Sequence, residues 1–272
     1  MLISLPSYYK VAADEWTPAE LFANDELGVW YEVLPEHLFQ DEAGTVPVTG
    51  DNQPVRRMQD ISGNGNHAIA PSDAARPLYR TDGTLHWLQP DGVDDTLVTP
   101  TLQWGVNSAM MSFALRKLSD SSSGIVMSFG NIGGNSGAFD LFAPGDGGAR
   151  RFRYRLSPHG SAGTTATAQT SASAWNAPIS VVASSQMKLG DDPLITLRLN
   201  GTLIDSESIS QSRTAFTASS LGLLGSREGG SAIPYSGRFY GGVIVMDWSP
   251  SKDTELFKLE EYLSQRAGVT LT

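Results

Sequence analysis

The sequence predicts an all-β protein built as a sandwich of two antiparallel sheets. The 272 residues include 28 Gly and 15 Pro, with 40% hydrophobic and only 18% charged residues, a composition typical of a globular, turn-rich chain. Short apolar segments follow one another at close spacing with turn residues between them, which indicates a sandwich. Asn200-Gly201 joins two alternating segments and predicts a two-residue β-hairpin, because both residues tolerate positive φ.

The chain opens with a segment that predicts a short helix within residues 14–39. Asp14 or Thr17-Pro18 would cap this helix, and Leu21 and Phe22 would lie on its inner face. Residues 28–31 then read as the first strand. Residues 40–84 are rich in Gly and Pro, without a regular period, and predict a long irregular segment that is functional or wraps a core.

Strand signals then arrive in sequence. They cover residues 85–88, 96–99, 109–118, 124–130, 138–143, 151–156, 179–186, 194–199, 202–206 and 239–247. Residues 160–177 read as a flexible loop by composition, but the alternation at 165–170 favours a polar outer strand. After Pro250 a helical spacing appears, and Gly268 stands where a helix ends. The predicted core between the sheets includes Trp30, Phe113, Phe129, Leu197 and Val245.

Charge and composition narrow the classes of partner. Lys and Arg total 19 against 29 Asp and Glu, so the net charge of −10 repels phosphate backbones and anionic membranes. The chain has no cysteine, which removes disulfides, thiolate metal sites and thiol nucleophiles. No apolar run approaches the length of a membrane span, and the N-terminus lacks the pattern of a secretory signal. We therefore expect no nucleic-acid binding and no membrane insertion.

Three stretches of sequence carry a resemblance to a known family. They are Asp60-Ile-Ser-Gly-Asn-Gly-Asn-His-Ala68, Arg76-Pro77 and Leu88-Gln-Pro-Asp-Gly-Val-Asp-Asp-Thr-Leu97. This text resembles the opening of a concanavalin A-like lectin/glucanase (laminin-G-like) jelly roll, in the version found in bacteriophage and prophage structural proteins. The hairpin at Asn200-Gly201 and the ending 261–270 are similar to that family too. The resemblance implies a jelly-roll domain over residues 16–272, with residues 1–15 as an extension or tether; Gln89-Pro90 departs from the family's usual aromatic before Asp-Gly.

Two acidic turns are candidate metal sites. Asp60, Ser62, Asn64 and Asn66 place a side-chain oxygen at every second residue, like the first half of a calcium loop, but Pro71 stands where the closing Glu belongs. Such residues also build tight turns without metal, and this structural interpretation is preferred. Asp91, Asp94 and Asp95 suggest a metal site or paired acid and base groups, yet the resemblance implies a turn there, in which one Asp binds backbone N–H groups.

Catalytic patterns are missing from the sequence. Retaining glucanases of this fold carry two Glu and one Asp alternating along one strand, which places two carboxylates about 5 Å apart. No such motif occurs, nor does a serine-hydrolase elbow, a zinc-protease pair or a phosphate-binding loop. His37, His67, His86 and His159 share no ligand spacing. We expect no catalytic residues and a protein that is not an enzyme.

Two tryptophans are candidates for glycan stacking. Trp104 and Trp175 lie in polar text that reads as loop, so an indole face could be exposed to a sugar ring. Packing of each ring against its own loop is the alternative.

The sequence thus leads to a functional expectation that depends mainly on the resemblance. It implies a non-enzymatic virion protein on a phage tail or particle surface, assembled in the host cytoplasm. Its partners would be other virion proteins and host cell-surface polysaccharide, and its role attachment or decoration. A polysaccharide-degrading enzyme on the same fold and a purely architectural baseplate or neck component remain alternatives. The sequence does not distinguish attachment from architecture.

Overall fold

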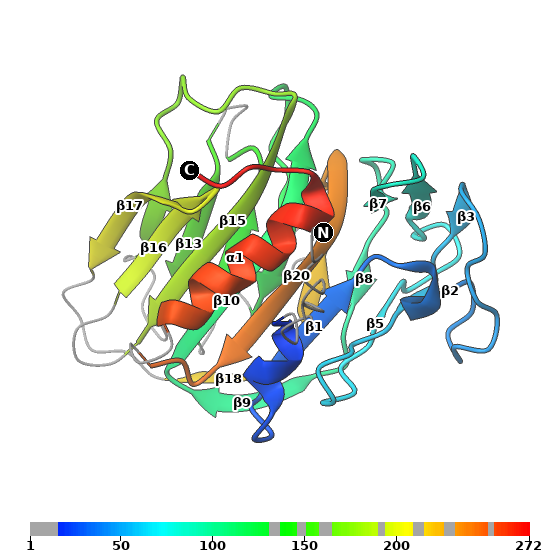
Figure 1. The fold of residues 1–272 in the computed structure, drawn as a ribbon, viewed down its shortest axis with the longest axis horizontal. Coiled ribbons are helices and arrows are strands. Elements are labelled where there is room, and N and C mark those ends of the chain that lie inside the picture. Colours follow the sequence, from blue (N-terminus) through cyan, green and yellow to red (C-terminus); the bar gives the residue numbers. More distant parts are fainter. Residues whose placement is uncertain are drawn as a thin grey trace, which may run out of the picture.

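The computed structural model of the protein describes residues 16–130, 137–145, 151–157, 165–189, 194–208, 215–225, 232–249 and 253–272. The predicted extension, residues 1–15, and the predicted helix cap Asp14 lie outside the described residues. Two large antiparallel sheets form the body of the protein, and one α-helix lies across the outer face of one of them (Figure 1). The predicted all-β sandwich with short N-terminal and C-terminal helices is confirmed.

The sheet beneath the helix, sheet A, has its long strands at the centre. Its order is β17 (Thr202–Ser208), β16 (Leu194–Leu199), β15 (Ile179–Lys188), β10 (Ser108–Lys117), β20 (Gly237–Met246), β7 (His86–Gln89), β6 (Leu78–Thr81) and β3 (Gln53–Pro54). β1 (Gly28–Glu32) also pairs with β20. The first strand of the chain therefore lies beside the last one.

The opposing sheet, sheet B, is built from shorter strands. Its order is β14 (Ala166–Gln169), β13 (Arg153–Ser157), β12 (Ala138–Phe142), β11 (Ile125–Phe129), β19 (Leu221–Leu223), β8 (Leu97–Val98), β5 (Ala68–Ile69), β4 (Arg57–Met58) and β2 (Leu38–Phe39). A separate antiparallel pair joins β9 (Leu102–Val106) to β18 (Phe216–Ser219). Short 3-10 helices cover Pro18–Phe22 and Pro35–His37, and α1 spans Asp253–Ala267.

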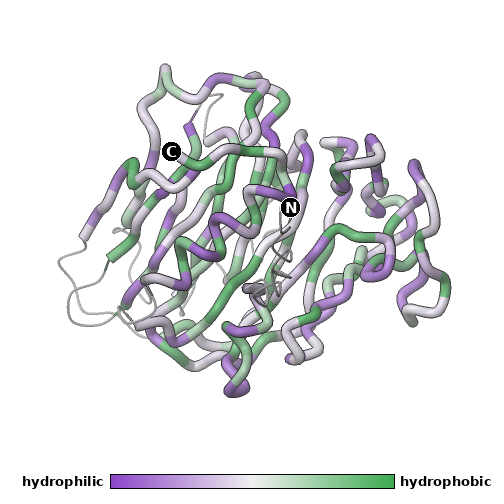
Figure 2. Tube along the Cα trace, in the orientation of Figure 1, coloured by the Kyte–Doolittle hydropathy of each residue, from purple (hydrophilic) through white to green (hydrophobic). Residues whose placement is uncertain are grey.

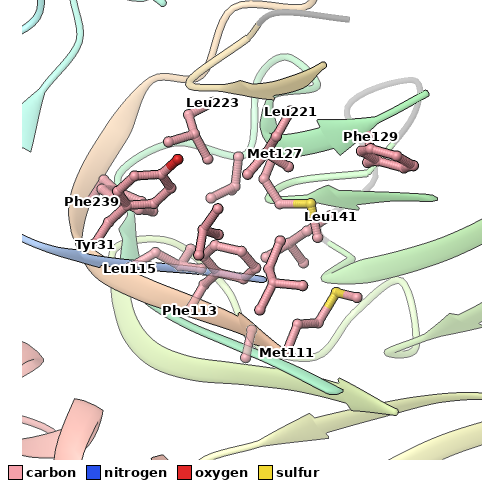
Figure 3. Packing of buried hydrophobic residues seen from close by; sticks show 14 of the residues in the cluster. Tyr31, Met111, Phe113, Leu115, Met127, Phe129, Leu141, Leu221, Leu223 and Phe239 are labelled. Atoms are coloured by element: carbon pink, nitrogen blue, oxygen red, sulfur yellow. The ribbon is translucent and has the colours of Figure 1, made fainter. Parts of the chain in front are cut away.

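The hydrophobic core fills the space between the two sheets (Figure 3). Met111, Phe113 and Leu115 alternate along β10 and meet side chains of sheet B such as Met127 and Leu141. Phe113 is fully buried and pairs in register with Gly242 of β20. A Cβ at Gly242 would lie 2.1 Å from Cδ1 of Phe113, so the glycine gives the ring its place.

A second hydrophobic cluster lies on the outer face of sheet A, beneath α1. Leu256, Leu259 and Leu263 of the helix cover Val243 and Val245 of β20. Figure 2 shows hydrophilic and hydrophobic residues alternating along α1, as expected for a helix with one buried side. The prediction that Trp30 and Val245 are core residues is confirmed, but they belong to this cluster and do not point between the sheets. Successive side chains of a strand point to opposite faces of the sheet. Both faces of sheet A are buried, because sheet B covers one face and α1 covers the other.

The Asn200-Gly201 hairpin is confirmed. The two residues have φ of 50° and 89°, and Leu199 pairs with Thr202 across the turn. The chain end at Thr272 lies against this turn, since its backbone N–H donates to the carbonyl oxygen of Asn200 at 2.8 Å. The polar outer strand predicted at 165–170 is also present, as β14.

Several strands were not predicted from the sequence. Residues 40–84 contain three two-residue strands, β3, β4 and β5, as well as β6, where the sequence indicated only an irregular segment. β9, β18 and β19 were likewise missed. Two-residue strands arise from backbone pairing with distant segments, as in Met58 opposite Ala68, and leave no periodic pattern. Among the described helices, none is both long and apolar enough to cross a membrane.

Candidate functional site

The turn that begins at Asp60 is a structural staple for β1. The buried Asp60 carboxylate accepts hydrogen bonds from the backbone N–H groups of Trp30, Ser62 and Asn66 at 2.9–3.0 Å, and from the Ser62 hydroxyl at 2.9 Å. The side-chain amides of Asn64 and Asn66 both donate to the carbonyl oxygen of Gly28. All four oxygen-bearing residues proposed as calcium ligands therefore hold the turn together and tie it to the first strand.

His67 completes this turn. Its Nδ1 accepts a hydrogen bond from the backbone N–H of Asp60 at 3.1 Å. Burial, assisted by the positive charge of Arg57, lowers the pKa of His67 below its usual value. Only an unprotonated Nδ1, as in neutral imidazole, can accept a hydrogen bond, so the geometry agrees with the lowered pKa of His67. The packed, hydrogen-bonded interpretation of this histidine is confirmed.

Asp91, Asp94 and Asp95 also come together at a turn. Their carboxylate oxygens lie within 4.8 Å of one another, with Asp91 and Asp94 exposed and Asp95 buried. Asp95 accepts a hydrogen bond from the backbone N–H of Asp91 at 2.7 Å, and Asp91 accepts one from Val93. Burial raises the pKa of Asp95 to about 6, with smaller contributions from the charges of Asp91 and Asp94. The backbone hydrogen bonds are those of a tight turn.

Trp104 is not an exposed platform, and the expectation that it lies in a loop is wrong. It belongs to β9, is only 5% exposed and stacks on Phe129 with ring centroids 4.4 Å apart. Gln103 and Gly105 on either side made the segment read as polar, but they point away from the core while the indole points into it. A sugar ring cannot reach this side chain in the folded protein.

Trp175 is half-buried and packs its ring partly against the core. It has a φ of 58°, in the left-handed region that is uncommon for a bulky residue. The backbone N–H of Ala177 donates to Asp120 at 2.7 Å, and Asp120 pairs with the fully buried Lys117 at 2.7 Å. The loop of Trp175 is thus anchored to the end of β10, and part of the indole stays accessible.

A pocket of about 430 Å³ lies beside α1, and we call it the helix-side pocket. It is lined by Trp16, Thr17, Lys258, Glu261, Tyr262, Gln265 and Arg266. Its volume falls in the range of small-molecule sites, roughly 300–1,000 Å³. The rings of Trp16 and Tyr262 meet edge to face with centroids 6.4 Å apart and planes at 79°. The two rings form an aromatic corner, with the Lys258 ammonium 5.8 Å from the Trp16 ring centroid and the Arg266 guanidinium 4.7 Å from the Tyr262 ring centroid.

A buried carboxylate of β1 fixes one wall of the helix-side pocket. Glu32 is 7% exposed; it accepts a hydrogen bond from the Tyr262 hydroxyl and pairs with the Arg266 guanidinium at 3.0 Å. Arg266 also donates to the Tyr262 hydroxyl at 2.8 Å. His37 lies 3.8 Å from the other oxygen of Glu32. These contacts hold the tyrosine ring and the arginine in place before any ligand arrives.

The helix-side pocket could not be found from the sequence. Trp16 comes from the start of the described chain and Tyr262 from the final helix, so only the fold brings them together. The helical spacing after Pro250 gave one usable signal, because Lys258, Glu261, Tyr262 and Gln265 fall on one side of the helix at intervals of three and four.

Comparisons with known proteins find similarity at the level of structure. The binding domain of Paraclostridial Mosquitocidal Protein 1 superposes with a TM-score of 0.55 at 14% identity, over 86% of this chain and 52% of that one. The botulinum neurotoxin type C structure described as entering cells through two ganglioside molecules gives 0.51 at 12% identity, over 77% and 51%. The Ruminococcus gnavus IT-sialidase CBM40 gives 0.44 at 19% identity, over 57% and 84%.

The two toxin structures support the fold, a β-sandwich. This chain spans about half the length of each of those two chains. No protein-family profile and no curated protein sequence matches the chain.

Proposed function

We propose that the protein is a non-enzymatic glycan-binding module and that the helix-side pocket is its binding site. The observation that carries the proposal is the aromatic corner of Trp16 and Tyr262 inside a pocket rimmed by hydrogen-bonding side chains. Sugar rings present apolar C–H faces and polar hydroxyl edges, and an aromatic surface with polar neighbours matches both. The mosquitocidal protein structure is described as a binding domain, and the botulinum neurotoxin type C structure is described as interacting with two ganglioside molecules, which supports a binding role on this fold.

The experiment is affinity electrophoresis through gels that contain bacterial lipopolysaccharide or capsular polysaccharide. We expect at least one polymer to retard the protein and the Trp16→Ala variant to migrate without retardation. Phe257→Ala is the matched control, because Phe257 is an exposed aromatic of the same helix outside the pocket lining. Undiminished retardation of Trp16→Ala would dismiss the pocket as the site.

A polysaccharide-degrading enzyme is the second candidate, and one observation favours it. Asp91 and Asp95 bring two carboxyl groups close together, and the pKa of Asp95 is raised to about 6, as for a general acid. Against it, the three acids lie on a turn whose backbone hydrogen bonds they satisfy, and two of them are exposed. Reducing ends released from a bound polymer by the wild type, and not by Asp95→Asn, would establish the enzyme in place of the binding module.

We propose the surface of a bacteriophage particle as the setting. The support is the resemblance of the Asp60 and Asp91–Asp95 turns to phage structural proteins, and the structure forms tight turns at both places. Other virion proteins would anchor the domain, and host cell-surface polysaccharide would be the ligand, with Trp175 as a further aromatic contact. Cryo-electron microscopy of the parent particle tests this setting. A purely architectural component would show the helix-side pocket covered by a neighbouring subunit.

A further inference from the structure

The charged side chains that line the helix-side pocket bear on whether it would bind neutral or acidic sugars. The Arg266 guanidinium forms an ion pair with the Glu32 carboxylate, with Nη2 and Oε1 3.0 Å apart. The positive charge of Arg266 is therefore balanced within the protein. Lys258 and Glu261 are both exposed and stand one turn apart on α1, where their charges offset each other. The rim therefore has no net charge, although it is rich in charged atoms.

The rim supplies both kinds of hydrogen-bonding group. The Glu261 carboxylate is an acceptor only, and it binds hydroxyl donors strongly because it is charged. Gln265 offers one acceptor and two donor positions, and the Thr17 hydroxyl serves as either. A neutral sugar ring, whose hydroxyl groups each donate and accept, uses all of these groups at once.

A carboxylate-bearing sugar would meet a poorer environment. Its charge needs a desolvated cation without an ion pair. The pocket lining has two cations, Lys258 and Arg266, and Arg266 is already paired with Glu32. Lys258 is exposed and lies 5.8 Å from the Trp16 ring centroid, so solvent and salt weaken its attraction for an anion. Glu261 and the overall charge of −10 would repel the sugar carboxylate.

Building on the proposed function, we infer that the helix-side pocket is selective for neutral sugar units and rejects uronic and sialic acids. The ring stacks on Trp16 while Tyr262 closes the corner, and Glu261 and Gln265 bind adjacent hydroxyl groups. Glu32 is a positioning residue, because it acts only through Tyr262 and Arg266.

The test compares neutral and acidic polymers directly. Dextran, laminarin and galactomannan are the neutral probes, and polygalacturonate, alginate and colominic acid are the acidic ones, with dissociation constants from isothermal titration calorimetry. We expect binding to one or more neutral polymers, with less than a twofold change between low and high salt, because no charge is exchanged. Glu261→Gln should weaken this binding about tenfold, equivalent to roughly 1.4 kcal/mol, whereas Phe257→Ala, outside the pocket lining, should leave it within about twofold.

Three outcomes contradict the inference in distinguishable ways. Binding of acidic polymers only, lost in both Trp16→Ala and Lys258→Gln, would overturn the neutral class while the glycan-binding function stands. Binding of neutral polymers that is unchanged in Trp16→Ala and Glu261→Gln would remove the site. Absence of binding to all six polymers would contradict both the neutral class and the proposed function. Circular dichroism and thermal unfolding of each variant separate lost binding from lost folding, and Phe257→Ala again serves as the control.

Discussion

At the scale of single residues, the burial of Asp95 makes the stability of the fold depend on pH. Its side chain is 5% exposed and its pKa is raised to about 6, chiefly by burial and further by the charges of Asp91 and Asp94. A carboxyl whose pKa is higher in the folded than in the unfolded state stabilises the fold below the unfolded value, near 3.8. This contribution is lost as the pH rises through about 6.

Replacing Asp95 by Asn should therefore change the pH dependence of stability. Asn keeps an oxygen to accept the hydrogen bond from Asp91 but has no charge to bury. We expect Asp95→Asn to be more stable than wild type at pH 8, by on the order of 1 kcal/mol, and equal to it at pH 4. Urea unfolding at the two pH values measures this difference. The exposed neighbour variant Asp94→Asn should show only a small change, and a constant difference across pH would contradict the buried-charge explanation.

At the scale of elements, the hairpin between β16 and β17 depends on one glycine. Gly201 has a φ of 89°, and its Cα faces the end of the chain, where an added Cβ would lie 3.2 Å from the carbonyl oxygen of Thr272. The turn is also tied to α1, because Arg198 pairs with the buried Glu260 at 2.8 Å. A change in the conformation of the turn would therefore also disturb its contacts with α1 and with Thr272.

We expect Gly201→Val to destabilise the protein by roughly 1–3 kcal/mol, because a β-branched residue at positive φ is strained. Asn200→Asp should be tolerated, since Asp also adopts positive φ readily. Thermal unfolding of both variants gives the comparison. Equal midpoints for the two variants would mean that the two-residue turn is not the one described.

The elements differ in how well the sequence predicts them, for physical reasons. Residues 109–118 predicted a strand that forms as β10, because eight consecutive apolar or small residues, 108–115, favour a strand that is buried on both faces. β9 was missed because Gln103 and Gly105, on either side of the buried Trp104, make the segment look like a polar loop. The short strands of residues 40–84 depend on partners far along the chain, and the helix-side pocket joins Trp16 to Tyr262 across nearly the whole sequence. Local pattern predicts long periodic strands well and long-range meeting points poorly.

At the scale of the whole molecule, stability comes from two hydrophobic clusters on opposite faces of sheet A. Phe113 and Leu197 point between the sheets, while Leu259 of α1 packs against the other face of sheet A. Each is fully buried. Sheet A is therefore covered on both faces, whereas many antiparallel sheets leave one face exposed to solvent.

Truncation in the core between the sheets should be costly. We expect Phe113→Ala and Leu197→Ala each to lower the free energy of unfolding by about 2–5 kcal/mol, as buried side chains leave cavities. Denaturant titration gives the values. Leu203→Ala is the matched control, because Leu203 is 54% exposed on the edge strand β17 and should change stability by less than about 0.5 kcal/mol. An unchanged midpoint for Phe113→Ala would contradict its place between the sheets.

The outer edge of sheet B lies where the two sheets meet at β14 and β17. Along β14, the backbone N–H groups of Thr167 and Gln169 donate to the carboxylates of Glu207 and Asp205 on β17, at 2.6 and 2.9 Å. These are the donors that a strand from another molecule would need for pairing. A strand that paired with β14 would have to displace the carboxylates of Glu207 and Asp205 from these N–H groups. The two carboxylates would then lose these hydrogen bonds. These two carboxylates therefore oppose the addition of a strand from another copy of the protein to the edge of β14, the first step of fibril growth through this edge.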